Sequence, residues 1–260
     1  FFSNPVHEIL EDSLKNIKLP IFPCSIVVHH YGKLDIDRNT QKGENYYLLG
    51  KMKYESDPTN VQFINELAKQ AQVLDKHEEA VELWLKLLSL IEADHQSPGY
   101  KEIAKVSYGG DPLSEIYSQL ALAYLTLDRF EEALKTARKT IESRVRLKES
   151  VHIYANCEII AGSLDNAFFA LDELLNTTPD YPPALFLMET IFYLKGEKEK
   201  AQEILQALLH SGVQMTPSLN KIARQLHANG KKDEALLILN AAIENNISNE
   251  TTKNMLVAFQ

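Results

Sequence analysis

One residue type, alanine, returns at a fixed interval along the second half of the chain. Ala133, Ala167, Ala201 and Ala235 follow one another at intervals of 34 residues, each inside a segment with leucine and charged residues at helical spacing. An earlier segment, HEEAVELWLKLLS, carries Ala80 in the same context. A fixed period of this length predicts a solenoid, in which helical units stack on their neighbours and share one continuous core.

Each repeated alanine is expected where the two antiparallel helices of a unit cross, because a larger side chain would push the helices apart. A second small position, early in the unit, is alanine in four units and Glu189 in the remaining one. Gly162, Gly196 and Gly230 occupy the turn between the helices and predict the positive φ of a helix C-cap. Alignment on the alanines gives five units: 61–94, 114–147, 148–181, 182–215 and 216–249.

The 34-residue period and the small crossing positions resemble the tetratricopeptide repeat. The resemblance implies an all-α, right-handed superhelix of antiparallel helix pairs. Two glutamates depart from the pattern: Glu189 at the small crossing position, and Glu158 where an aromatic residue is usual.

Three segments flank or interrupt the units. Residues 41–60 form a linker and capping segment, in which 42–56 has a helical pattern and is expected to cover the apolar end of the array. Residues 95–113 contain Ser-Pro-Gly and Gly-Gly-Asp-Pro, so this insertion predicts a loop with a short helix at 100–106. Residues 250–260 are expected to form the final capping helix.

Charge and cysteine content restrict the partners and the location. The net charge is −9 and the pI is about 5.4, which argues against a nucleic-acid partner or an anionic membrane surface. No apolar run is long enough to span a bilayer, and no secretion signal is visible. Cys24 and Cys157 are in neither a Cys-x-x-Cys motif nor a metal-ligand spacing, so a reduced, cytoplasmic location is predicted.

Residues 1–40 do not follow the repeat. A short helix is predicted over 6–16 and a strand over 25–28, which the sequence His29-His30-Tyr31-Gly32 closes. A lone strand cannot satisfy its own edges and needs a sheet. We therefore expect residues 1–40 to be the remnant of an α/β domain, and the chain to be part of a longer protein.

The order of motifs Val6-His7-Glu8, a strand ending in HHYG, a charged helix closing in DPTN, and a repeat array resembles the C-terminal end of bacterial family-2 glycosyltransferases that carry tetratricopeptide repeats. The resemblance covers residues 1–60. It implies that Glu8 is the base acting on the acceptor hydroxyl, and that His30, with His29 as the alternative, contacts the metal or the diphosphate. It also implies a divalent metal and a nucleotide-sugar for the complete enzyme, whereas this chain by itself would hold no cofactor and be catalytically incomplete.

A second acidic motif, Asp35-Ile36-Asp37, matches the Asp-x-Asp pair that holds a divalent metal and a sugar diphosphate. This motif follows HHYG, whereas the family's metal pair lies far upstream. We therefore interpret it as a solvated linker.

The first helices of the units are expected to line a concave groove that binds a partner. Two functions follow: the partner- or acceptor-binding region of a family-2 glycosyltransferase, with a protein, a peptide or a glycosyl acceptor in the groove, or a free-standing scaffold that binds peptides or proteins there. In a third, purely structural interpretation, the groove residues only solvate one face. The predicted groove residues are Asn65, Lys69, His152, Asn156, Phe186, Thr190, Tyr193, Asn220 and Arg224.

Overall fold

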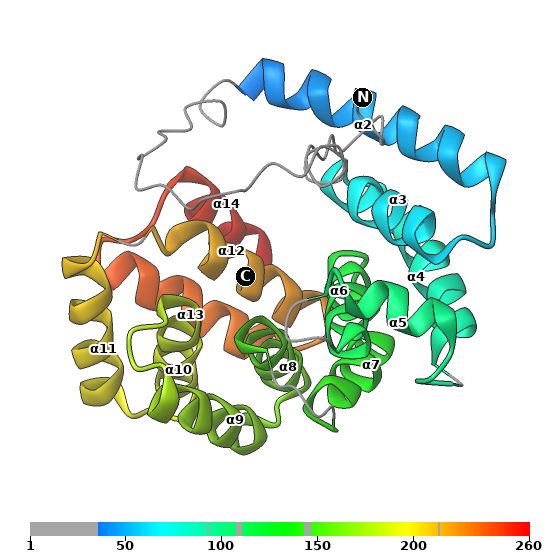
Figure 1. Ribbon diagram of the computed structural model, residues 1–260. Coiled ribbons are helices and arrows are strands. Elements are labelled where there is room, and N and C mark those ends of the chain that lie inside the picture. The colour runs from blue at the N-terminus through cyan, green and yellow to red at the C-terminus, as the bar shows by residue number, and fades with distance from the viewer. Residues whose placement is uncertain (1–35, 93, 108–110, 143–146, 213) are drawn as a thin grey trace, which may run out of the picture.

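A computed structural model describes residues 36–92, 94–107, 111–142, 147–212 and 214–260 (Figure 1). These residues form thirteen helices and no strand. The predicted helix over 6–16 and strand over 25–28 lie outside the described residues. The helices are α2 (Ile36–Ser56), α3 (Val61–Val73), α4 (His77–Ile91), α5 (Pro98–Ala104), α6 (Pro112–Thr126), α7 (Phe130–Glu142), α8 (Lys148–Ala161), α9 (Leu164–Thr177), α10 (Pro182–Leu194), α11 (Lys198–His210), α12 (Thr216–Ala228), α13 (Lys232–Glu244) and α14 (Glu250–Phe259).

The five predicted units are five antiparallel helix pairs: α3 with α4, α6 with α7, α8 with α9, α10 with α11, and α12 with α13. The repeated alanines have no exposed surface, as expected at a helix crossing. Glu189 takes the place of the second small residue in the fourth unit and is only 4% exposed. The all-helical prediction for the repeat region is confirmed.

The turn between the two helices has the same backbone form in all five units, although its residue changes. Gly162, Gly196 and Gly230 have φ values of 87°, 77° and 76°, as the sequence predicted. Asp75 and Asp128 occupy this turn in the first two units, both with φ of 57°. Aspartate is one of the few residues with a side chain that enters the left-handed region readily.

The flanking helices differ in extent from the prediction. Helix α2 begins at Ile36, six residues before the predicted start at Lys42, and packs on α3. The insertion holds α5 over Pro98–Ala104, close to the predicted 100–106. Helix α14 confirms the predicted C-terminal helix and starts with a capping box between Asn249 and Thr252.

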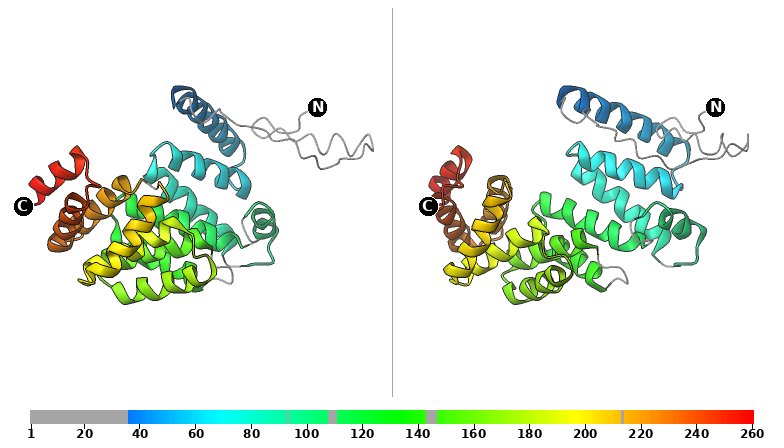
Figure 2. Two further views of the ribbon diagram at one scale, coloured as in Figure 1. Left: turned by 90° about the vertical axis from the view of Figure 1, so that its left-hand side faces the viewer. Right: turned by 60° about the vertical axis from the view of Figure 1, so that its left-hand side comes forward.

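The fifth unit does not stack on the fourth in the way that the earlier units stack. Helix α4 packs on α6, α7 on α8, and α9 on α10, as a continuous solenoid requires. Helices α11 and α12, by contrast, are barely in contact. Instead α12 packs against α8, and α13 packs against α10. The last unit thus lies against the inner side of the array (Figure 1), and the array as a whole is an arc with α2 and α14 at its two ends (Figure 2).

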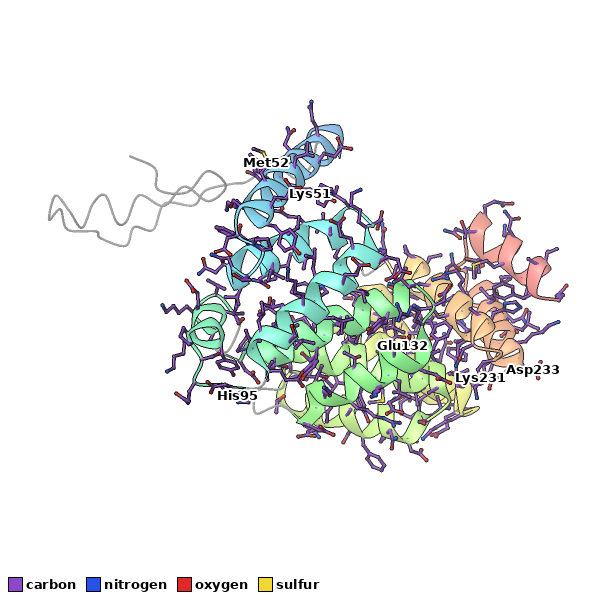
Figure 3. All side chains as sticks on the ribbon, turned by 90° about the vertical axis from the view of Figure 1, so that its right-hand side faces the viewer. Lys51, Met52, His95, Glu132, Lys231 and Asp233 are labelled. Atoms are coloured by element: carbon purple, nitrogen blue, oxygen red, sulfur yellow. The ribbon has the colours of Figure 1, made fainter. Side chains whose placement is uncertain are left out.

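Polar contacts between distant units hold the fifth unit in this position. One guanidinium nitrogen of Arg224 lies 2.9 and 2.8 Å from the two carboxylate oxygens of Asp128, in the turn of the second unit. The buried Gln225 donates from Nε2 to the carbonyl oxygen of Leu125 at 3.0 Å. Three side chains of α12 and its C-terminal turn make such contacts, the third being Asn229, which donates to Ile160 at the end of α8. In Figure 3, Lys231 and Asp233 mark this end of the array, while Lys51 and Met52 mark α2 at the other.

Candidate functional site

A cavity of about 300 Å³ lies between α6, α8, α10 and α12, which are the first helices of units two to five. We call it the inner cavity. It exists because the fifth unit turns inward, so that α12 forms a fourth wall opposite α6 and α8. Its apolar lining residues are Leu122, Leu125, Ile153, Pro182, Pro183, Phe186, Leu187, Met215 and Ile222.

Two polar residues, His152 and Asn156, stand one turn apart on the α8 wall of the inner cavity. The backbone carbonyl of Pro183 lies near the His152 ring. Nδ1 of the ring is buried and has no hydrogen-bond partner within the described residues. Burial lowers the pKa of His152 to about 4, so the ring is neutral at neutral pH.

Asn156 presents a similar buried atom. Its Oδ1 is buried and has no hydrogen-bond partner within the described part of the chain. A buried oxygen without a partner loses its bond to water and gains nothing in return. The α8 wall therefore carries two buried polar atoms without a partner among the described residues, next to an apolar space.

The α12 side of the inner cavity is polar and more open, with Gln214, Ser218 and Lys221 at its rim. Atoms that keep water from the amine lower the pKa of Lys221, and the positive charge of Arg224 lowers it further. No carboxylate among the described residues forms an ion pair with Lys221. The rim thus carries a cation without a counterion among the described residues.

Three of the nine predicted groove residues meet in the inner cavity: His152, Asn156 and Phe186. Two others lie in the first unit, where Asn65 is buried and Lys69 forms an ion pair with Glu115 at 2.6 Å. These two residues are remote from the inner cavity, because none of its four walls comes from the first unit.

The other four predicted groove residues are used for contacts within the chain. Thr190 is buried and donates to the carbonyl of Phe186. The hydroxyl of Tyr193 accepts a hydrogen bond of 2.7 Å from Asn245, which follows α13. Asn220 donates to the α14 N-cap, Asn249, and accepts from Thr252, while Arg224 pairs with Asp128. The fifth unit and α14 thus occupy the face that an open array would present.

Sequence reasoning missed the α12 side of the cavity. Lys221 follows the predicted inner position Asn220 and would face away from the groove in a regular stack. Its position at the rim results from the inward turn of the fifth unit, which depends on contacts across about one hundred residues. The sequence feature nearest to this turn is Gly212, which follows α11 with φ of 73°.

The residues of the predicted glycosyltransferase site, Glu8, His29 and His30, lie outside the described residues, as does the side chain of Asp37. In the part of the chain that the structure describes, no three or more His, Cys, Asp or Glu side chains gather in a group that could hold a metal ion. The thiol of Cys157 is buried, and burial raises its pKa well above the usual range. No described helix is long and apolar enough to cross a bilayer.

Comparison with known proteins gives structural neighbours only. No protein-family model matches the sequence, and no curated protein does. A tetratricopeptide repeat protein from Parabacteroides merdae matches with a TM-score of 0.55 and 15% identity, over 86% of this chain and 80% of its own. The chain has the tetratricopeptide fold. PilW, a widely conserved type IV pilus biogenesis factor, matches at a TM-score of 0.56 and 17% identity, over 84% of this chain and 92% of its own. YrrB, a tetratricopeptide protein with an unusual peptide-binding site, matches at a TM-score of 0.50 and 12% identity, over 79% of this chain and 96% of its own.

Proposed function

We propose that this chain is a tetratricopeptide scaffold that binds a segment of a protein partner in the inner cavity. The observation that carries the proposal is an apolar space of about 300 Å³ bordered by His152 and Asn156, each of which has a buried polar atom without a partner among the described residues. Binding sites combine an apolar lining with a few convergent polar groups, and this cavity has both. The peptide-binding site named for YrrB, which has the same fold, supports the same use here.

The test is a selection from a displayed library of random twelve-residue peptides on the immobilised 260-residue chain. Leu122→Trp places a large ring in the cavity and should abolish capture of the selected peptides. The matched control is Leu237→Trp, which makes the same change at a residue of α13 that is 38% exposed. The control should bind as the unchanged chain does. Equal binding by both variants would place the peptide site elsewhere.

A narrower function, as part of a family-2 glycosyltransferase, is a second candidate. It is supported by the order of motifs in residues 1–60, with Glu8 as the base and His30 as the metal or diphosphate contact. In that case the partner in the cavity would be a glycosyl acceptor or a protein that carries one. The test needs a natural reading frame that includes a nucleotide-sugar domain. Glu8→Gln should then keep donor binding and lower turnover by about 10²-fold, and unchanged turnover would reject the role.

A further inference from the structure

We propose that the inner cavity recognises an apolar residue and a carboxylate side by side: a large apolar side chain of the partner enters the cavity, and a carboxylate next to it pairs with Lys221. The inference rests on the proposed function and specifies the chemistry of the partner. Three properties of the cavity support it: the groups that a ligand can reach, the charges around the apolar space, and the short distance between that space and the lysine.

The α12 side of the inner cavity carries polar groups that a ligand can reach. Gln214, Ser218 and Lys221 line the cavity and are exposed, whereas the unpartnered polar atoms on the α8 wall are buried. Ser218 and Lys221 are three residues apart on α12, so their side chains lie on one face of the helix. None of the three side chains forms a hydrogen bond or an ion pair with another described residue. An amide, a hydroxyl and an amine all donate, and a carboxylate is the group that accepts from several donors at once.

The charge on the α12 side favours an anion. Lys221 has no carboxylate partner among the described residues, and Arg224, one turn further along α12, adds positive charge beside it. Surrounding atoms already keep part of the water from the Lys221 amine and lower its pKa, so its charged form gains more from a carboxylate than a fully solvated lysine would. A lysine or arginine of the partner would be repelled at the same place.

The α8 side carries the opposite charge. Glu149, in the first turn of α8, acts on the His152 ring with a sign opposite to that of Lys221. Glu149 and Lys221 form no ion pair with each other, so each charge acts on its own side of the cavity. A carboxylate of the partner is therefore directed toward α12 and away from the first turn of α8.

The apolar space and the lysine are so close that the two ligand groups must be neighbours. Lys221 and Ile222 are consecutive lining residues, and Phe186 of α10 lines the same space. A volume of about 300 Å³ is large enough for a leucine, methionine or aromatic side chain. A carboxylate at this distance comes from one of two sources: the side chain of an adjacent aspartate or glutamate, or the main-chain carboxylate of an apolar C-terminal residue. The experiment distinguishes the two sources.

The experiment starts from peptides selected on the unchanged chain whose binding Leu122→Trp abolishes. Each peptide is synthesised with a free and with an amidated C-terminus, and each acidic residue is replaced in turn by its amide. We expect one of these neutralisations to weaken binding by about two- to fivefold in calorimetric titration at low salt, and by less at high salt. The neutralisation that has this effect identifies the source of the carboxylate. The inference is overturned if every neutralisation costs less than about twofold.

Two lysine variants test whether the carboxylate pairs with Lys221. The neutralisation that weakens binding to the unchanged chain should have no further effect on Lys221→Gln, because the amine is already absent. Lys101→Gln is the matched control, since it makes the same change at an exposed lysine of α5, which lines no part of the cavity. On this control the neutralisation should keep its full effect. An equal loss on both variants would overturn the assignment, because the effect would then reflect net charge alone. Both lysines are exposed, so both variants are expected to fold, and circular dichroism checks this.

The outcomes separate the inference from the proposed function. If peptides are selected and Leu122→Trp removes their binding, the cavity is a peptide site, whatever the neutralisations show. If such peptides bind equally well without their carboxylates, the cavity is confirmed and the chemistry proposed for its ligand is wrong. If no selected peptide is sensitive to Leu122→Trp, the proposed function fails, and the inference with it.

Discussion

Glu158 and Glu189 are buried carboxylates in successive units, but their polar contacts differ. Glu158, on α8, has no exposed surface and accepts a hydrogen bond of 3.1 Å from Nε of Arg138 on α7 of the preceding unit. Glu189, on α10, is 4% exposed and forms no ion pair with any described residue. Its nearest polar contact is the Thr190 hydroxyl, at 3.4 Å.

The difference follows from how the two units are stacked. At Glu158 the regular stack brings α7 onto α8, so the preceding unit can supply a cation. At Glu189 the covering surface is the inward-turned fifth unit, which offers Leu219, Ile238 and Ala242. An apolar site without a cation favours the neutral, protonated form of a carboxyl group. Burial accordingly raises the pKa of Glu189 to about 8. The regular stack thus supplies a cation to the buried Glu158, whereas the inward-turned unit supplies none to Glu189 among the described residues.

The largest expected effect comes from making Glu158 resemble Glu189. Arg138→Met removes the cation but keeps much of the volume of the side chain, and leaves a fully buried carboxylate unpaired. The Arg138 side chain is 53% exposed, so the loss should be smaller than for a pair buried on both sides, about 2–3 kcal/mol. Chemical denaturation at pH 7 measures the change in the free energy of unfolding.

The control is a double variant that removes both charges of the ion pair. Glu158→Gln combined with Arg138→Met removes both charges and should recover a large part of the lost stability, because no buried charge remains. If Arg138→Met alone cost less than about 0.5 kcal/mol, the ion pair would be no more important than an exposed one.

The second prediction tests whether the helix crossing in the unit that contains Glu189 is as tightly packed as the crossings of the other units. Ala201 is fully buried at the crossing of α10 and α11, in a cluster with Tyr193 and Ala241. Ala201→Phe should destabilise by about 2 kcal/mol, because the ring does not fit between the helices. Ala228→Phe, at an exposed helical alanine, is the matched control and should change stability by less than about 0.5 kcal/mol. Thermal unfolding of both variants is the measurement, and an unchanged midpoint for Ala201→Phe would reject the assigned crossing.

The third prediction makes Glu189 permanently neutral. The folded pKa of about 8 lies above the ordinary value of 4.5, so the stability contribution is fully present below pH 4.5 and is lost as pH rises through 8. Glu189→Gln should therefore nearly match the unchanged chain at pH 4.5 and exceed it by at least about 2 kcal/mol near pH 8.5. Denaturation midpoints measured across this pH range give the slope of stability against pH.

His152 provides an internal contrast for the same titration. Its folded pKa, about 4, lies below the ordinary 6.5, so its contribution is present above pH 6.5 and is lost as pH falls through 4. The two slopes have opposite signs and lie in different pH ranges. A pH dependence between 6.5 and 8.5 that survived in Glu189→Gln would assign it to another group.

The repeat itself could be predicted from the sequence because it depends on local features. The buried Ala133 and Ala235 fix the register, and Gly162 marks a turn, since each is recognisable within its own unit. The same reasoning could have found Asp128 at the turn of the second unit, because aspartate tolerates a positive φ. These features recur every 34 residues in the last four units and once more in the first unit, so five copies reinforce one another.

The inner cavity could be predicted only in part. His152, Asn156 and Phe186 follow from the helix face that the repeat assigns to the groove. Lys221 does not, because its place depends on the inward turn of the fifth unit. That turn results from contacts between residues about one hundred positions apart, as between Gln225 and Leu125, and no periodic pattern encodes them.

The smallest expected effect concerns the ion pair that joins the inward-turned unit to the regular stack. Arg224 and Asp128 have side chains that are 44% and 39% exposed, so water screens their attraction in spite of the short contacts. Arg224→Gln should cost less than about 1 kcal/mol and lose even that cost at high salt, since the exposed pair is screened there in the unchanged chain too. The buried amide of Gln225 and the packing of α13 on α10 remain in the variant, and they are expected to hold the fifth unit in place. Denaturation at low and high salt measures the cost, with Arg129→Gln as a control because the exposed pairs of Arg129, with Glu132 and with Glu78 of the first unit, do not involve the fifth unit. A loss of several kcal/mol with Arg224→Gln, absent with Arg129→Gln, would mean that the ion pair holds the inward turn, and that Glu189 is buried because of it.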